Sequence, residues 1–384
     1  MRLLTINAGS SNTKLALFER HDGLPRRIGK AQAIHDGDRW RLTLEGRPVD
    51  APGNVSSASL LDAIDRTWPL AGIAAIGHRV VHGGSGFRTP VRLDPETLLE
   101  LRELEPLAPL HQPANLAMVD AVAAQLPSLP QVACFDTAFH ATLRERAWRF
   151  ALPRRLADAG VRRYGFHGLS YQSIRDQLRT RAPELARGRV VVAHLGAGCS
   201  ACAMDDGVSV DTSMGFSALD GLPMATRCGA LDPGVVLHLL LQRGMTADAV
   251  HDMLYRDSGL RGLSGISGDA RDLTASDDPR AAMALDVFAF RIAREIGALA
   301  VSLGGLDGVV FTAGVGEHQP RIRRMVCGHL GLFNACLDDA ANERGEPRFD
   351  AAGSGLALWM LHTDEEAVIA DATQHVLASV GAGR

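Results

Sequence analysis

Two stretches of the chain share one order of apolar, small and alternating residues. In the first, an apolar run at residues 3–8 is followed by Gly9 and two serines, and residues 12–17 then alternate between polar and apolar side chains. Residues 190–204 repeat this order about half the chain length later, with Gly198 in the middle. Such a pattern predicts a β-hairpin, and its glycine turn leaves backbone N–H groups open to an anion. The repeat therefore predicts two phosphate-binding hairpins in a duplicated nucleotide-binding fold.

Other periodic segments predict strands that alternate with helices. Apolar runs predict strands at residues 73–76, 131–135 and 308–312, and helical periodicity predicts helices at residues 114–124, 280–303 and from Asp364 onward. This alternation indicates an α/β protein. The last helix is expected to fold back onto the first domain.

Two helices of the second half carry more detailed predictions. The nearly continuous apolar run at residues 235–241 predicts a buried helix after Pro233. In the long helix that follows, the spacing of Val287, Phe290 and Ala293 predicts that these three residues share its apolar face.

Length and charge set the broad class. At 384 residues the chain exceeds one ordinary hydrophobic core, so two domains are expected: residues 1–140 with 368–384, and residues 141–367. A net charge of −4 gives no reason to expect nucleic acid or an anionic membrane as a partner. The start of the chain has no signal-peptide pattern, and Asp307 interrupts the most apolar late segment, so we expect a soluble cytoplasmic protein.

The six cysteines do not suggest a metal or disulfide framework. Cys199 and Cys202 form a C-x-x-C pair, but no second pair or nearby histidine completes a zinc site. Residues three apart on a strand point to opposite faces. We therefore expect small buried thiols in a reducing compartment.

The glycine turns carry polar side chains. Asn7, Ser10, Ser11 and Lys14 offer neutral oxygens and a cation to a phosphate or a metal ion, although the same residues could satisfy their own hairpin backbone. Lys14 is one of only two lysines in the chain. A third glycine turn, at residues 312–316, is predicted between a strand and a helix whose first N–H groups could contact a ligand.

Five further side chains are candidates for phosphoryl chemistry. Arg79 and Arg227 lie in glycine-containing loops, and a guanidinium matches carboxylate and phosphoryl oxygens with two parallel hydrogen bonds. His167 lies in a tight glycine turn, where it either serves a ligand or is a buried histidine bonded to backbone. Asp136 and Glu366 could hold a metal ion, directly or through water, or could be a helix cap and a surface acid.

Together these segments resemble the acetate kinase family, within the superfamily of actin, heat-shock chaperones and sugar kinases. The most specific stretches are residues 78–84, 135–140, 163–168, 211–216, 226–229 and 231–233. The resemblance covers nearly the whole chain, from Ile6 to Glu366. It implies a duplicated actin-like (ribonuclease H-like) two-domain α/β fold with a nucleotide cleft between the domains, and it implies a homodimer.

The function implied by the resemblance is reversible, ATP-dependent phosphorylation of acetate, and by hypothesis propionate, to an acyl phosphate by direct in-line transfer. Chemistry agrees, because a carboxylate is already an anionic nucleophile and needs no general base. The obstacle is to bring it against a polyphosphate, which cationic side chains and Mg²⁺, or Mn²⁺ in its place, would solve electrostatically.

The resemblance also assigns roles to single residues. Arg79 and Arg227 would bind the carboxylate and the phosphoryl group in flight, His167 would donate to that group in the transition state, and Asp136 would complete the catalytic set. The acyl pocket would be formed by Arg79 with three apolar residues, Val81, Leu110 and Phe166.

The implied metal ligands are Asn7 and Glu366. The implied nucleotide contacts come from the first hairpin, the second hairpin, the adenosine pocket and the third glycine turn: Lys14, His194, Gly196, Ala197, Gly198, Asp269, Ala270, Arg271, Gly314, Val315, Gly316, Glu317 and His318.

The chain departs from the family pattern at several positions. The family usually has asparagine where Ala197 and His318 stand, histidine at Tyr171, and aspartate at Ala230. Ala218 stands where proline is frequent and would enlarge the acyl pocket. These departures make nucleotide affinity an open question, and the last one predicts that propionate is accepted beside acetate.

Two other functions fit part of the pattern. A sugar or polyol kinase of the same superfamily would need an aspartate as base, a role open to Asp136, but a neutral sugar gains little from paired arginines. An ATP-driven binding protein, like the actin or chaperone relatives, would polymerise or bind peptide instead. Sedimentation in the presence of ATP distinguishes this second alternative.

Overall fold

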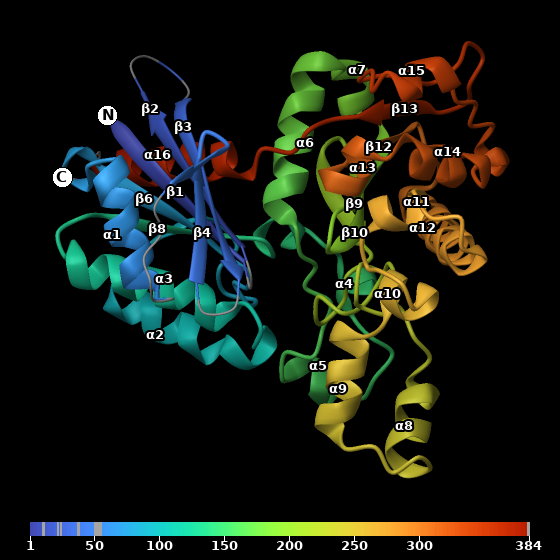
Figure 1. The fold of residues 1–384 in the computed structure, drawn as a ribbon, viewed down its shortest axis with the longest axis horizontal. Helices are drawn as coiled ribbons and strands as arrows, with labels where there is room; N and C mark the ends of the chain where they lie inside the picture. Colours follow the sequence, from blue (N-terminus) through green and yellow to red (C-terminus); the bar gives the residue numbers. More distant parts are fainter. Residues whose placement is uncertain (10–11, 21–22, 24, 37–38, 50–55, 382–384) are drawn as a thin grey trace. The chain divides into compact units, whose positions relative to one another are not determined.

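The computed structural model describes residues 1–9, 12–20, 23, 25–36, 39–49 and 56–381. Ser10 and Ser11, which the first turn was predicted to contribute, lie outside these residues. The described chain forms two compact units, Met1–Phe139 with Asp364–Arg384, and His140–Thr363 (Figure 1). The two units are described separately below.

The first unit is built on a mixed sheet. Its strands, in sheet order, are β5 (Arg47–Val49), β4 (Arg39–Leu44), β3 (Arg26–Asp36), β2 (Asn12–Glu19), β1 (Arg2–Ala8), β6 (Ala75–Val80), β8 (Gln131–Phe135) and β7 (Val91–Arg92). β1 and β2 form the predicted antiparallel hairpin, with Ala8 opposite Thr13. β6 adds parallel to β1 and β8 adds parallel to β6, so the carboxyl ends of three strands meet at one edge.

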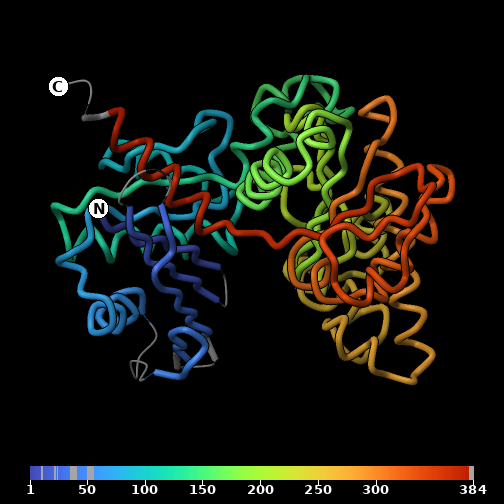
Figure 2. The backbone as a smooth tube through the Cα atoms, turned by 90° about the horizontal axis from the view of Figure 1, so that it is seen from above, coloured from blue at the N-terminus to red at the C-terminus, as the bar shows by residue number. Residues whose placement is uncertain are grey.

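Helices cover the two faces of this sheet. Neighbouring residues of a strand point to opposite faces, and Leu4 packs in the cluster with α1 (Ser57–Thr67) and α3 (Gln112–Gln125), whereas Leu3 packs with Ala370 of α16 (Glu365–Gly381). The predicted return of the last helix is confirmed, because α16 packs against β1, β6 and β8. Figure 2 shows α16, in red, beside the N-terminal strands. The unit also contains α2 (Pro95–Glu103) and the short helices Leu70–Gly72, Glu105–Leu107 and Ala138–His140 at its boundary.

The second unit repeats the order of the first. Its sheet is β11 (Val208–Thr212), β10 (Cys199–Asp205), β9 (Arg189–Leu195), β12 (Gly308–Thr312) and β13 (Ala357–Met360). β9 and β10 form the second predicted hairpin, and β12 and β13 add in parallel. In both units an antiparallel hairpin is therefore extended by parallel strands on the side of its first strand. The duplication expected from the two glycine turns is confirmed.

The helices of the second unit surround this sheet and form a separate helical region. α6 (Gly168–Arg181), α7 (Pro183–Ala186) and α12 (Pro279–Leu303) pack against β9. The remaining helices are α4 (Glu145–Trp148), α5 (Arg154–Asp158), α8 (Pro233–Leu241), α9 (Ala247–Arg256), α10 (Gly259–Ser264), α11 (Ala270–Thr274), α13 (Ala313–His318), α14 (Pro320–Gly328), α15 (Asp339–Glu343) and the short Gly331–Phe333.

Two predictions about helix burial were wrong. The run at residues 235–241 does form a helix, α8, but none of its residues is buried, and Leu241 is 73% exposed. Of the three residues predicted on the apolar face of α12, Ala293 is buried and Val287 is half-buried, but Phe290 is 47% exposed. The buried face is instead centred on Leu285, Phe288 and Ile292. In an alanine-rich helix two faces offer similar apolar spacing, so periodicity alone does not choose between them.

The third glycine turn was predicted wrongly in the role of its glycines. β12 ends at Thr312 and α13 begins at Ala313, inside the predicted segment, but Gly314 and Gly316 lie within the helix. The change of direction occurs at Ala313, which has a left-handed φ of 64°. A non-glycine residue held in this region is strained.

No helix among the described residues is long and apolar enough to cross a membrane.

Candidate active site

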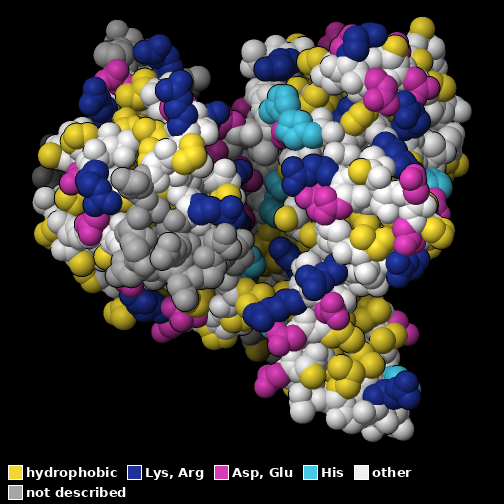
Figure 3. All heavy atoms as spheres, in the orientation of Figure 1, with side chains coloured by type: hydrophobic (Ala, Val, Ile, Leu, Met, Phe, Trp, Pro, Cys, Tyr) yellow, Lys and Arg dark blue, Asp and Glu magenta, His cyan; other side chains and the backbone are white. Residues whose placement is uncertain are grey.

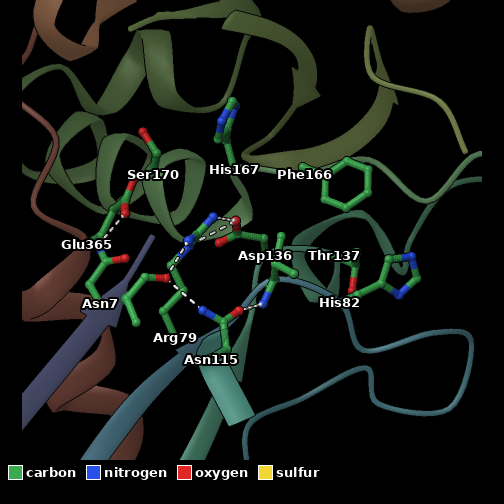
Figure 4. A network of polar contacts seen from close by, with 12 residues as sticks. Asn7, Arg79, His82, Asn115, Asp136, Thr137, Phe166, His167, Ser170 and Glu365 are labelled. Atoms are coloured by element: carbon green, nitrogen blue, oxygen red, sulfur yellow. Dashed lines mark hydrogen bonds and ion pairs between the residues drawn. The ribbon is translucent and has the colours of Figure 1, made fainter. Parts of the chain in front are cut away.

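In the first unit, Asn7 links the end of β1 to the start of α16. Its side-chain amide donates to Glu365 Oε2 at 2.8 Å and to Glu366 Oε1 at 3.0 Å, and the first of these bonds is drawn in Figure 4. Burial raises the pKa of Glu366, and the adjacent carboxylate of Glu365 adds to the rise, although Lys14 opposes it. Two carboxylates and an amide thus bring several hard oxygen atoms close together. The sequence analysis had identified Asn7 and Glu366 as candidates, but not Glu365.

Arg79 and Asp136 form an ion pair at the carboxyl ends of parallel strands. Arg79 lies near the end of β6 and Asp136 directly follows β8. Nε and Nη2 of Arg79 donate to Asp136 Oδ2 at 3.1 and 2.6 Å, and Nη1 donates to the Ala8 carbonyl at 3.3 Å (Figure 4). Burial disfavours the guanidinium charge, but Asp136, with Glu365 and Glu366, outweighs burial and raises the pKa of Arg79. The arginine is therefore a fixed cation held by a buried carboxylate.

Two amide side chains of α3 hold the neighbouring loop in place. Asn115 donates to the Ala8 carbonyl at 2.6 Å and accepts from the Val81 N–H at 2.9 Å (Figure 4). Gln112 accepts from the His82 N–H at 3.1 Å and donates to the His82 carbonyl at 3.1 Å. Sequence analysis missed both amides, because their partners are distant in sequence and only a folded sheet brings them together.

The three predicted apolar residues of the acyl pocket do not belong to one unit. Val81 is buried and Leu110 is half-buried in the first unit, while Phe166 is buried in the second. Val81 follows Arg79 closely in the sequence and Phe166 directly precedes His167, whereas Leu110 has no predicted catalytic residue nearby in the sequence. A shared pocket remains a prediction.

In the second unit, His167 lies directly before α6 with a left-handed φ of 58°. Its Nδ1 is 2.8 Å from Ser200 Oγ. The ring stacks on that of His194, with centroids 4.1 Å apart and planes 17° apart. His194 Nδ1 in turn contacts Ser170 Oγ at 2.8 Å. Both histidines are thus held through Nδ1 by hydroxyl groups.

Gly198, in the second hairpin turn, lies close to the guanidinium of Arg227 and the imidazole of His167. A Cβ at this position would lie 3.2 Å from Arg227 Nη2 and 3.4 Å from His167 Nε2. Arg227 is fixed by donating from Nη1 to the Ala218 carbonyl at 2.7 Å. The absence of a side chain at Gly198 therefore lets the guanidinium and the imidazole approach one point above the turn, called the Gly198 space below. Donors that converge on one point suit an oxyanion.

Glu317 organises the segment around α13. Its Oε1 accepts from the N–H groups of Ala313 at 2.9 Å and Thr363 at 3.1 Å, and its Oε2 contacts His362 Nδ1 at 2.7 Å. His318 is mostly exposed, 3.8 Å from Glu317 Oε2. Glu317 is therefore occupied within the protein, and its predicted contact with the nucleotide remains untested.

The other predicted nucleotide residues are spread over the second unit and one strand of the first. Asp269 caps α11 and pairs with the exposed Arg271 at 2.6 Å, whereas Ala270 is buried. Nothing lies within 4 Å of the position that a Cβ on Gly314 would take. Lys14 lies exposed on β2, beside a cavity of about 270 Å³ that also includes Glu366.

The thiols of the C-x-x-C pair are inert. Cys199 and Cys202 are buried and free, and burial raises the pKa of each to about 12. A thiolate, the form that binds metals, is thus disfavoured at both positions. Among the described residues no group of three or more histidine, cysteine, aspartate or glutamate side chains is arranged to hold a metal ion.

Comparison with known proteins identifies close relatives along the whole chain. The model of the acetokinase family matches residues 2–371. Acetate kinase of Rhodopseudomonas palustris is 49% identical, covering 100% of this chain and 99% of that protein, and acetate kinase of Nitrobacter hamburgensis is 44% identical, covering 98% and 95%.

Solved structures of proteins with the same family names are also similar to this chain. A propionate kinase from Francisella tularensis superposes with a TM-score of 0.92 at 32% identity, covering 98% of this chain and 99% of that one. Acetate kinase of Porphyromonas gingivalis gives a TM-score of 0.86 at 33% identity, with the same coverage.

Proposed function

The chain belongs to the acetokinase family, and from this premise we propose that it transfers the γ-phosphoryl group of ATP reversibly to acetate, forming an acyl phosphate. The observation that carries the proposal is the space above Gly198, which Arg227 and His167 border together. An in-flight phosphoryl group carries its charge on peripheral oxygens, and paired donors in fixed positions stabilise such charge most effectively.

Arg79 is the proposed cation for the carboxylate. It is held by two hydrogen bonds to Asp136 and one to Ala8, so it needs no reorganisation when the anion arrives. Asp136 Oδ2 already accepts two N–H groups of Arg79, which is the arrangement of a positioning carboxylate. This geometry favours a carboxylate acceptor over the sugar hydroxyl that a free aspartate base would activate.

The donors around Asn7 suit Mg²⁺, and Mn²⁺ would fit the same oxygens. Asn7, Glu365 and Glu366 supply hard oxygen atoms. Burial, together with the carboxylate of Glu365, raises the pKa of Glu366, and a cation bound beside it would favour its charged form. A site with few protein ligands is typical of Mg²⁺, which keeps several waters. Mg²⁺ bound there would neutralise phosphate oxygens. Asn7 would orient the two glutamates, because its side-chain amide already donates a hydrogen bond to each carboxylate.

The second unit is the proposed nucleotide-binding domain. The turn from Gly196 to Gly198, His194, the Asp269–Arg271 segment and the start of α13 would contact ATP, with Lys14 contributing from the first unit. The open space beside Gly314 supports this assignment, because an adenine needs room there. The cytoplasm is the proposed location, in agreement with six free cysteines.

The protein is proposed to be a homodimer. In support, α8 exposes Val235, Leu237 and Leu241, at 40%, 55% and 73%. Figure 3 shows apolar side chains, in yellow, gathered over α8 and α9. An apolar patch on a helix that nothing covers is typical of an interface. Light scattering at micromolar concentration measures the mass directly.

Hydroxylamine trapping of the acyl phosphate tests the proposed activity. Purified protein is incubated with MgATP and acetate, propionate or butyrate in parallel, and we expect hydroxamate from acetate and propionate. Arg79→Ala and Arg227→Ala should abolish it. Arg102→Ala is the matched control, because Arg102 pairs with Asp120 in an exposed ion pair of the first unit and should retain activity. Absence of product with every acid, despite bound ATP, would contradict the proposal.

A further inference from the structure

Ser200 lies between the imidazole of His167 and the phenol of Tyr171. Its Oγ is 2.8 Å from His167 Nδ1 and also hydrogen bonds with Tyr171 Oη. Ser200 and Tyr171 are both fully buried, on β10 and α6. One hydroxyl therefore connects a buried phenol to the ring nitrogen of His167 that faces away from the Gly198 space.

The number of protons limits how this chain of hydrogen bonds can run. A serine hydroxyl has one proton to donate and two lone pairs to accept with. If Tyr171 donates to Ser200, the proton of Ser200 is directed to His167 Nδ1, and the proton of a neutral imidazole must then be on Nε2. In the opposite direction Nδ1 carries the proton, and Nε2 presents only a lone pair.

The surroundings of His167 favour the first direction. Its Nε2 borders the Gly198 space together with Arg227 Nη2, and a phosphoryl oxygen in that space needs a donor. A cationic imidazole is disfavoured so close to the guanidinium of Arg227. Two further histidines pack nearby: His194 stacks on the ring of His167, and the ring centroids of His140 and Tyr171 lie 5.6 Å apart. Burial lowers the pKa of His140 to about 4, which favours its neutral form. An imidazole carries no negative charge, so these two rings do not favour a second cation.

We propose that Tyr171 and Ser200 form a hydrogen-bond relay that holds His167 as the neutral Nε2–H tautomer, directed at the transferred phosphoryl group. Both are positioning residues, since neither touches the reacting atoms. The role of the relay in catalysis rests on the proposed kinase function. Position 171 is usually histidine in the family that the sequence resembles. A phenol at this position can offer its proton to Ser200, which is the direction of donation that the relay requires.

Kinetics of three variants separate positioning from folding. Ser200→Ala removes the bond to Nδ1 and should lower kcat roughly 10-fold, less than the roughly 100-fold cost of losing a whole oxyanion donor. The KM for acetate and for MgATP should change little. Tyr171→Phe keeps the ring and should lower kcat in the same way. Ser200→Thr retains a hydroxyl and should recover much of the loss if the buried strand accommodates the methyl group.

Thr373→Val is the matched control. Thr373 is as fully buried as Ser200, and its Oγ1 donates to the Ile369 carbonyl at 2.7 Å within α16 of the first unit. Its removal should leave kcat within about two-fold, since this bond closes inside α16 and holds no group of the relay. Equal kcat losses in Ser200→Ala and Thr373→Val, at equal thermal stability, would overturn the positioning role.

Nitrogen NMR of the histidine side chains reads the tautomer without any activity. ¹⁵N-labelled protein is compared with His167→Gln to assign the ring, and we expect a protonated Nε2 and an unprotonated Nδ1 near neutral pH. In Ser200→Ala the two nitrogen shifts should move toward each other as the tautomers mix. A protonated Nδ1 in the unmodified protein would overturn the relay. The expected tautomer in a protein that forms no acyl phosphate would instead overturn the proposed function and leave the relay's geometry in place.

Discussion

Gly198→Ala places one methyl group where the account puts the transferred phosphoryl group. The new Cβ would lie 3.2 Å from Arg227 Nη2 and 3.4 Å from His167 Nε2. A carbon–nitrogen contact of 3.2 Å is shorter than normal van der Waals separation, so the guanidinium must shift by a few tenths of an ångström. The methyl also removes space from the oxyanion. Misplacements of about 1 Å cost up to about 100-fold, so we expect kcat to fall about 10- to 100-fold, equivalent to about 1.4 to 2.7 kcal/mol.

Folding should be preserved in this variant. The φ of Gly198 lies outside the left-handed region, so alanine introduces no backbone strain. The assay is hydroxamate formation at saturating acetate and MgATP, with a thermal melt of each protein. Gly297→Ala is the control: nothing lies within 4 Å of a Cβ there, and alanine in helix α12 should add up to about 1 kcal/mol of stability without changing kcat. Full kcat in a folded Gly198→Ala protein would refute the convergence of Arg227 and His167 on the phosphoryl group.

The remaining predictions concern charge. Asp136→Asn leaves Arg79 in a buried site without its carboxylate, and should lower the free energy of unfolding by about 3 kcal/mol in urea titration and reduce kcat/KM for acetate. Burial lowers the pKa of His78 and His140 to about 4, whereas in the unfolded chain each histidine binds its proton near pH 6.5. Between these two pH values the unfolded chain holds more protons than the folded protein. The free energy of unfolding is therefore highest above pH 6.5 and falls as pH falls toward 4, by up to about 1.4 kcal/mol per pH unit for each histidine. Urea titrations at several pH values measure that slope, which His78→Asn should reduce. Glu366→Gln should raise the Mg²⁺ concentration for half-maximal activity at least about 10-fold. Because its pKa is raised, the Mg²⁺ requirement of the unmodified enzyme should increase as pH falls, and a magnesium titration of the variant should lack that dependence.

Local patterns predicted the two hairpins well. Each consists of neighbouring residues, with Ala8 opposite Thr13 in one and Leu195 opposite Cys199 in the other, so alternation and a glycine turn contain nearly all the information that is needed. The α/β class followed from the same short-range signals. The duplication could be read because both copies keep their glycine.

Burial was predicted less well, since it depends on what packs against an element. The apolar run of α8 correctly indicated a helix, but its sequence does not reveal whether the chain itself covers it. Ala313 shows a related limit: its left-handed φ is stabilised by Glu317, whose carboxylate accepts its N–H. No local propensity predicts such a conformation for alanine.

The candidate site was likewise predicted only in part from the sequence. Residue types and resemblance singled out Arg79, His167 and Arg227, but not the groups that hold them. Glu365 contacts Asn7 across 358 positions of sequence, and Ser200 contacts His167 across 33. Such partners become visible only when the fold places them, since serine and glutamate are common surface residues.

The most direct test of the central claim follows the oxygen atoms of acetate. The enzyme is incubated with MgATP and acetate labelled with ¹⁸O in both carboxylate positions, and the products are analysed by mass spectrometry and nucleotide chromatography. The account predicts acetyl phosphate that retains both labelled oxygens, with one ADP formed for each molecule. Release of AMP, loss of label from the acetyl phosphate, or ADP formed without any acetyl phosphate would contradict direct transfer to the carboxylate.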